Sequence, residues 1–279
     1  MRWSIIRRCA WPALAVLLLG CSTSVGERVH GAETQLLVEN FEPLELGPDI
    51  PVRVWAREEP AAGNGAPWHL YLEGDGAAWR RGGVPTLNPT PQVPVALELA
   101  VADASPRVAY VARPCQFHDV LPRACRPPLW TDERYGVQVQ QWLLQAFEAV
   151  AGEEPLRIVG FSGGAHLALQ LAPGLDNVVG VVSVAGNLDD AEFAKHHALP
   201  KPRHVPPKGD DLPLWSYSGE GDRIVPPRLT ERMLQARGGA CQFHQVVAGA
   251  GHDGPWRIDW PEIEAFLAGC QYAATESSR

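Results

Sequence analysis

Short apolar runs alternate along the chain with longer segments in which apolar side chains recur at helical spacing. The runs that favour strands cover residues 35–41, 52–56, 68–72, 107–112, 156–159, 178–184, 214–218 and 242–247. The segments that favour helices cover residues 95–104, 135–150, 165–171, 228–237 and 261–267. Strands that alternate with helices predict an α/β fold with a mostly parallel central sheet and helices on both faces. Active residues are then expected at the carboxyl ends of the strands.

Two stretches interrupt this pattern. Residues 21–34 are polar and lack periodicity, which predicts a tether between the N-terminal region and the body. Residues 187–212 are polar and rich in His, Lys and Pro, which favours a small cap or lid segment. The remaining length is enough for one sizeable core, so residues 35–279 are expected to form a single domain.

The first twenty residues have the composition of a secretory signal peptide. Arg2, Arg7 and Arg8 form a basic start, and the apolar run 13–19 is too short to span a bilayer as a helix. Small residues then precede Cys21. The Leu-Leu-Gly-Cys ending resembles a bacterial lipobox, which implies cleavage before Cys21 and acylation of its thiol. The alternative is an ordinary signal peptide with a chance cysteine.

The lipobox resemblance also implies a place in the cell. Acyl chains on Cys21 would anchor an exported lipoprotein at the periplasmic face of the outer or inner membrane. Ser22 follows the cysteine where some lipoproteins carry Asp, and in such families this favours the outer membrane.

The charge balance excludes some partners. The full chain carries a net charge of −8, and removal of three arginines with the signal makes the mature charge −11. The sequence has no basic patch that would predict nucleic-acid binding. An acidic body has no net electrostatic attraction to anionic lipid. The acyl anchor alone is therefore expected to hold the protein at the membrane.

Four cysteines remain in the body: Cys115, Cys125, Cys241 and Cys270. An even number in an exported domain favours disulfides, and of the three possible connectivities the local pairing is favoured. No Cys-x-x-Cys or Cys/His ligand spacing is present, so neither a metal nor a cofactor is expected.

The clearest chemical signal is the stretch 160–164, Gly-Phe-Ser-Gly-Gly, between a predicted strand and a predicted helix. A serine on a turn this sharp is strained, and side chains two residues to either side would clash, which accounts for Gly160 and Gly164. The N–H of Gly163 lies at a helix start and is free to bind an oxyanion. This pattern predicts a nucleophilic Ser162. The alternative is a tight turn with an idle serine.

Two loops supply a base and an acid. Asp222 follows the strand predicted at 214–218, and His252 follows the strand predicted at 242–247. The order Ser162, Asp222, His252 resembles that of the α/β-hydrolase superfamily, and the likeness covers about residues 36–267. It implies that Ser162 is the nucleophile, His252 the base and Asp222 the acid that orients the base. Asp189 and Asp190 follow the strand 178–184, where some members carry the acid, and remain the alternative.

The resemblance extends to the oxyanion loop. Residues 73–76, Glu-Gly-Asp-Gly, are similar to that loop in α/β-hydrolases, with Glu in the place of a histidine. This implies that the Asp75 N–H is the second donor beside Gly163. The same stretch and residues 113–116, Arg-Pro-Cys-Gln, resemble a branch of bacterial lipoproteins whose members are mostly uncharacterised. His166 is expected to pack rather than to act as a base.

The resemblance therefore implies a serine hydrolase that cleaves a small-molecule ester or thioester through an acyl-enzyme on Ser162. A peptidase of the same fold would use the same residues. A non-catalytic binding lipoprotein on a hydrolase scaffold is the third hypothesis.

Overall fold

The structure is a computed structural model that describes residues 23–60, 65–199 and 212–277. The signal peptide predicted at 1–20, Cys21 and the second half of the predicted cap segment lie outside the described residues. The predicted end of the signal peptide and the prediction of a single domain remain predictions.

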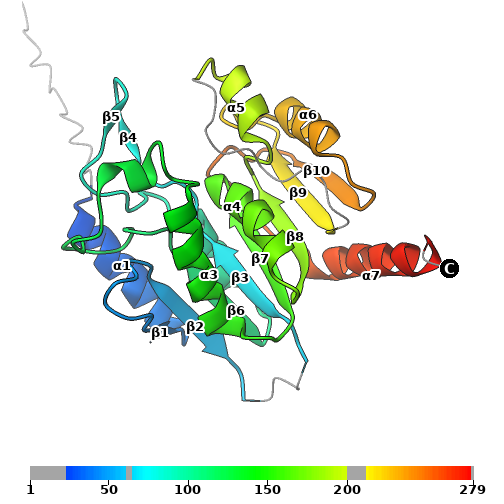
Figure 1. The fold of residues 1–279 in the computed structure, drawn as a ribbon, viewed down its shortest axis with the longest axis horizontal. Coiled ribbons are helices and arrows are strands. Elements are labelled where there is room, and N and C mark those ends of the chain that lie inside the picture. The colour runs from blue at the N-terminus through cyan, green and yellow to red at the C-terminus, as the bar shows by residue number, and fades with distance from the viewer. Residues whose placement is uncertain (1–22, 61–64, 200–211, 278–279) are drawn as a thin grey trace, which may run out of the picture.

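An eight-stranded sheet forms the centre of the molecule (Figure 1). Within it, β2 runs antiparallel to both of its neighbours, and the pairs from β6 to β10 are parallel, so the prediction of a mostly parallel sheet is confirmed. The strands in sheet order are β1 (Glu42–Leu44), β2 (Val54–Glu58), β6 (Arg107–Val111), β3 (Trp68–Leu72), β7 (Leu156–Phe161), β8 (Val178–Val184), β9 (Leu214–Gly219) and β10 (Gln242–Val247).

Helices cover both faces of the sheet, as predicted. One face packs against α3 (Val137–Ala151), α4 (Gly163–Leu171) and α6 (Pro227–Arg237). The other packs against α1 (Val25–Val38), α2 (Val95–Ala102) and α7 (Trp260–Ser277). The central strand β3 shows why both faces are apolar: Leu70 and Leu72 enter one core and Tyr71 enters the other.

Smaller elements complete the described chain. The hairpin of β4 (Trp79–Arg80) and β5 (Val84–Pro85) forms a separate two-stranded sheet. α5 (Asp190–His196) lies within the predicted cap segment, and two short 3₁₀ turns span Pro127–Trp130 and Ala172–Gly174. Across the described ranges, no helix combines the length and the hydrophobicity needed to cross a membrane.

The prediction for the start of the body was wrong. The aperiodic tether to residue 34 and the strand 35–41 are replaced from residue 25 by the helix α1. Ser24 and Glu27 form a capping box, in which each side chain accepts a hydrogen bond from the other residue's backbone N–H. Ala32 and Leu36, four residues apart, enter the core. The Ser-x-x-Glu spacing was the sequence signal of this helix, and the polar composition concealed it.

The local cysteine pairing is confirmed. Cys115 pairs with Cys125 at a Cα–Cα distance of 5.7 Å, and Cys241 pairs with Cys270 at 5.8 Å. The first bridge closes a loop that follows β6, and the second joins the start of β10 to α7.

The packing of α1 predicts a difference between two adjacent leucines. Leu36 is fully buried and Leu37 is 59% exposed. We expect Leu36→Ala to lower the free energy of unfolding by about 2–4 kcal/mol, because it leaves a cavity in the core. Leu37→Ala should change it by less than about 0.5 kcal/mol. Urea denaturation of both variants measures the difference, and equally small losses would contradict the docking of α1 on the body.

Candidate active site

Ser162 lies at a sharp turn between β7 and α4, with φ 50° and ψ −117°. A Cβ at Gly160 would approach the Cα of Ala165 to 2.4 Å, and a Cβ at Gly164 would approach the carbonyl oxygen of Leu72 to 2.4 Å. Any larger residue at either position would therefore force the turn apart, as the Gly-x-Ser-x-Gly spacing predicts.

Hydrogen bonds to adjacent segments of the same chain hold the strained backbone of Ser162 in place. Its N–H donates to the Val184 carbonyl at 2.9 Å, and its own carbonyl accepts from the N–H of Asn187 at 3.0 Å and from that of Ala165 at 3.2 Å. These contacts join the turn to the end of β8, so the strain is supported on two sides.

The structure brings Ser162, His252 and Asp222 together at the carboxyl ends of β7, β10 and β9. His252 Nε2 lies 3.1 Å from Ser162 Oγ, and His252 Nδ1 lies 2.9 Å from Asp222 Oδ2. The second oxygen of Asp222 accepts from the N–H groups of Ile224 and Val225 at 2.7 and 2.9 Å. This geometry matches the arrangement of a nucleophile, a base and an orienting acid.

The Asp222 carboxylate is suited to orient a base. Burial raises its pKa, but the hydrogen bond and the charge of His252 together with the two backbone N–H groups outweigh burial and hold the pKa below its usual value. The loops that carry Asp222 and His252 also touch directly, because the Gly221 N–H donates to the Ala250 carbonyl at 2.9 Å. Asp222 and His252 are therefore fixed relative to each other.

The alternative acids lie elsewhere. Asp189 caps α5 by accepting from the N–H groups of Ala191 and Glu192. Asp190 accepts from the Asn187 side chain at 2.8 Å. Among the described residues, the carboxylate that contacts His252 is that of Asp222.

Both expected oxyanion donors are free. Within the described parts of the chain, the N–H groups of Gly163 and Asp75 donate to no protein acceptor. The loop that carries Asp75 is nevertheless fixed: the Glu73 N–H donates to the Val111 carbonyl at 3.1 Å, and Gln116 Nε2 donates to the Gly74 carbonyl at 3.0 Å. A fixed loop with an unused N–H is what a preorganised oxyanion site requires.

The Asp75 carboxylate has a second role that the sequence did not reveal. It accepts from Arg113 Nη1 at 2.9 Å and from the Tyr135 hydroxyl at 3.4 Å, and it lies 3.1 Å from Arg134 Nε. Burial raises its pKa, but the two guanidinium groups outweigh burial and keep the pKa below its usual value. A Cβ at Gly163 would lie 2.0 Å from Asp75 Oδ1, so the ion pairs require glycine directly after Ser162.

These contacts explain part of the stretch 113–116, whose Arg113 and Gln116 both hold the oxyanion loop. The sequence analysis noted this stretch only because it resembles a branch of bacterial lipoproteins, and it predicted no role for these residues. His166 packs against the Tyr135 ring at a centroid distance of 4.2 Å, and its complete burial lowers its pKa to about 3. It is thus a neutral packing residue.

Glu73 is a buried carboxyl group beneath the oxyanion loop, with 1% of its surface exposed. It accepts from the Gly74 N–H at 2.9 Å and from the Tyr110 hydroxyl at 3.1 Å. Burial is the dominant influence and raises its pKa from 4.5 to about 7.

Ser162 and His252 open into a pocket of about 540 Å³. Apolar side chains form much of its lining, notably Trp79, Val93 and Ile224, which are also exposed at the mouth. The pocket also includes Phe193 of α5, so the described part of the predicted cap lies at its edge. A role as a lid remains a prediction.

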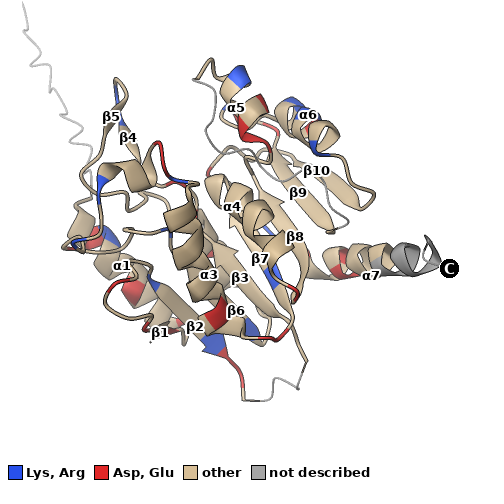
Figure 2. Cartoon of the chain, viewed as in Figure 1, with Lys and Arg blue, Asp and Glu red and all other residues tan. Residues whose placement is uncertain are grey.

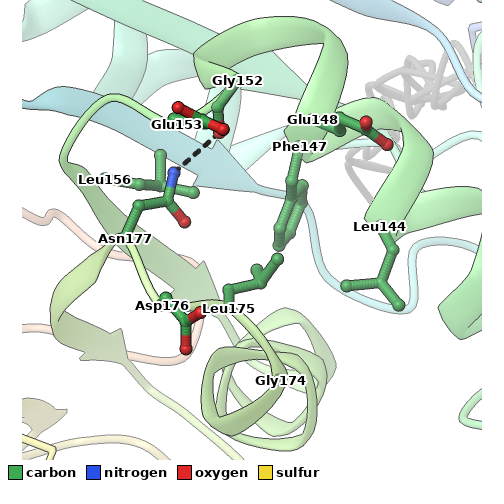
Figure 3. Close-up of a pocket in the computed structure, with 10 residues that line it drawn as sticks. All are labelled: Leu144, Phe147, Glu148, Gly152, Glu153, Leu156, Gly174, Leu175, Asp176 and Asn177. Carbon is green, nitrogen blue, oxygen red and sulfur yellow. Dashed lines mark hydrogen bonds between the residues drawn. The ribbon is translucent and has the colours of Figure 1, made fainter.

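A second pocket, of about 580 Å³, lies far from this chemistry (Figure 3). It surrounds Leu156 at the amino end of β7, whereas Ser162 follows the carboxyl end of the same strand. Figure 3 shows Asn177 in this pocket, where its side-chain amide donates to the Gly152 carbonyl at 3.0 Å. In the described ranges, no group of three or more His, Cys, Asp or Glu side chains is arranged to hold a metal ion.

No protein-family model and no curated protein matches this sequence. Solved structures do match. An α/β serine hydrolase without a lid from Xanthomonas campestris is similar at 16% identity and TM-score 0.50 over 85% of this chain and 94% of that one. A putative hydrolase from Bacillus subtilis is similar at 13% identity and TM-score 0.53 over 82% and 93%.

A peptidase of the same architecture is also similar. The acylaminoacyl peptidase of Pyrococcus horikoshii matches at 16% identity and TM-score 0.52 over 78% of this chain and 39% of that one. At such low identities the likeness shows the fold. The chain has the α/β-hydrolase fold.

The buried carboxyl of Glu73 predicts a pH dependence of stability. A pKa raised to about 7 means that the folded chain binds more protons than the unfolded chain between pH 4.5 and 7. The free energy of unfolding contributed by Glu73 therefore falls as the pH rises through this window, by on the order of 1–3 kcal/mol. Glu73→Gln should remove that part of the decline in urea denaturation at several pH values.

The matched control for this experiment is Glu59→Gln, because Glu59 is exposed. This variant should keep the slope of the original protein. If Glu73→Gln keeps the same slope as well, Glu73 is not the titrating group.

Proposed function

We propose that this protein is a serine hydrolase that cleaves carboxylic esters or thioesters through an acyl-enzyme on Ser162. The observation that carries the proposal is the continuous hydrogen-bonded chain from Ser162 through His252 to Asp222, which opens into a pocket. Two unused N–H groups beside the serine supply the rest of the machinery.

The geometry supports a two-step acyl transfer. His252 Nε2 removes the proton from Ser162 Oγ as the oxygen attacks the carbonyl carbon of the substrate. The N–H groups of Gly163 and Asp75 bind the oxyanion, and one such donor contributes about 3–4 kcal/mol to transition-state stabilisation. His252 then protonates the leaving alkoxide or thiolate. Water, deprotonated by the same histidine, attacks the acyl-enzyme and releases the acid, while Asp222 stabilises the imidazolium.

The pocket favours an ester over a peptide. Its mouth is open and apolar, with Trp79, Val93 and Ile224 exposed. The solved structure of an esterase, E25, is similar over 88% of this chain and 80% of its own length, at TM-score 0.50 and 14% identity. A peptidase would use the same three residues and is the second hypothesis. The hydrogen bonds that join Ser162, His252 and Asp222 argue against the third hypothesis, a non-catalytic binding protein.

The proposal predicts selective chemistry at Ser162. A fluorophosphonate probe should label the full chain but not Ser162→Ala, and nitrophenyl esters should be cleaved faster than aminoacyl-naphthylamides. Ser162→Ala and His252→Ala should each abolish turnover, and the double variant should add little, because the residues act as a unit. Asp222→Asn should lower the rate by roughly 10⁴.

His196→Ala is the matched control, since this exposed histidine of α5 contacts no member of the triad within the described residues. Equal labelling of the original chain and Ser162→Ala would refute the nucleophile assignment. Faster cleavage of the naphthylamides would favour the peptidase.

We also propose that the mature protein is a lipoprotein of the bacterial envelope, anchored through acyl chains on Cys21. The support is the Leu-Leu-Gly-Cys ending of the signal-like segment and the short distance of four residues from Cys21 to Val25, where α1 begins. In cells grown with a clickable palmitate analogue, the protein should carry the label in the membrane fraction. Cys21→Ser should remove it, whereas Cys9→Ser should not. Label retained by Cys21→Ser would refute the anchor.

A further inference from the structure

The β4–β5 hairpin carries an exposed surface that the core does not explain. Trp79 is 47% exposed, Val84 55% and Leu87, just after the hairpin, 76%. The hairpin belongs to a two-stranded sheet of its own, and such a pair of strands gains little stability by itself. Trp79 lies on one face of the hairpin opposite Pro85, and Val84 lies on the other face opposite Arg80, so the hairpin exposes apolar side chains on both faces. Exposed apolar side chains concentrated on one short segment commonly mark an interaction surface.

Basic side chains accompany the apolar ones. Arg80 and Arg81 precede the turn formed by Gly82 and Gly83, and both are exposed. Within the described chain, neither arginine forms an ion pair. Figure 2 shows Lys or Arg on β4 at the raised hairpin. Trp, Arg and aliphatic residues together are typical of surfaces that enter the headgroup region of a bilayer.

The loop between the paired cysteines extends this surface. Val120 in that loop is 87% exposed, and Arg123 and Arg126 beside it are exposed as well. The Asn88 side chain, at the base of the hairpin, donates to the His118 carbonyl at 2.9 Å. The hairpin and the loop are therefore neighbours on one side of the molecule.

The start of α1 lies on the same side (Figure 1). A Cβ built on Gly26 would lie 3.0 Å from a carboxylate oxygen of Asp119 in the same loop. Acidic groups near the start of α1 include Asp119 and Glu27, and the Glu27 carboxylate accepts a hydrogen bond from the Ser24 N–H in the capping box. Residue 21 lies four residues before Val25, which is at most about 14 Å of extended chain.

We propose that the segment 79–87 and Val120 form a docking surface for a lipid bilayer that contains anionic phospholipid. The apolar side chains enter the headgroup region, and the four arginines Arg80, Arg81, Arg123 and Arg126 contact phosphate and acidic headgroups. The net charge of the chain opposes such binding on average, but residues 79–87 and 120–128 carry four arginines and no acidic residue.

The same surface reaches the proposed catalytic mouth. Trp79 belongs both to the hairpin and to the pocket that holds Ser162. Docking would therefore turn the pocket toward the bilayer and bring esters dissolved in or near the lipid to the serine. Binding of the surface to lipid is independent of the proposed hydrolysis, and the experiment keeps the two apart.

Vesicle cosedimentation tests the proposal with the full chain that carries Cys21→Ser and Ser162→Ala, so that neither acylation nor turnover contributes. We expect stronger binding to vesicles of phosphatidylcholine with phosphatidylglycerol than to phosphatidylcholine alone. Adding Val84→Ser and Leu87→Ser should weaken binding roughly tenfold, because two exposed apolar side chains no longer enter the lipid. Adding Arg80→Gln and Arg81→Gln should reduce the preference for the anionic vesicles by roughly tenfold.

The matched control is Leu37→Ser with Val38→Ser, a pair of exposed apolar residues at the other end of α1. Every variant keeps the same N-terminal segment, so differences report the docking surface. Binding unchanged by Val84→Ser with Leu87→Ser overturns the proposal, as does an equal loss in the control. Self-association that these serines abolish, without vesicle binding, would instead assign the surface to a second copy of the chain.

Discussion

The structure depends on one strained residue, Ser162, whose left-handed backbone conformation the surrounding packing imposes. The turn requires glycine at positions 160 and 164, because a Cβ at either position would overlap backbone atoms. Hydrogen bonds to Val184, Asn187 and Ala165 then hold the backbone of the serine in this conformation. The strain is stabilised by the rest of the parallel sheet, and it places the hydroxyl where the histidine loop after β10 can reach it.

A second constraint is electrostatic. The Asp75 carboxylate, on the loop that presents one oxyanion donor, lies between Arg113 and Arg134, and Arg134 in turn approaches Asp190 to 3.5 Å. The charges are partly buried and paired, and removal of one partner from such a pair is destabilising because it leaves an uncompensated buried charge. Their effect here is to hold the Asp75 carboxylate against Gly163. The same crowding forbids a side chain directly after Ser162, so Asp75, a residue distant in sequence, explains why position 163 is glycine.

The sequence predicted the parts of the molecule that local patterns encode. Strands β3, β8 and β10 have the predicted bounds because each is a near-continuous apolar or alternating run. Ser162, Asp222 and His252 were predictable because each follows a strand and lies in a short motif that contains glycines at characteristic positions. The helix α1 was missed because its apolar face is narrow and its polar residues suggested a tether. The roles of Arg113, Arg134 and Tyr135 were also missed, since they converge on Asp75 only in three dimensions.

The Cys241–Cys270 bridge has a consequence for how the C-terminal region responds to cleavage. It closes a covalent ring of chain that contains β10, the His252 loop and most of α7. A single protease cut within this ring, for instance after the exposed Arg257, would leave the two fragments joined. His252 would therefore stay covalently attached to the rest of the molecule after the cut. The bridge therefore makes the histidine-bearing segment tolerant of a single backbone cut wherever the disulfide stays oxidised.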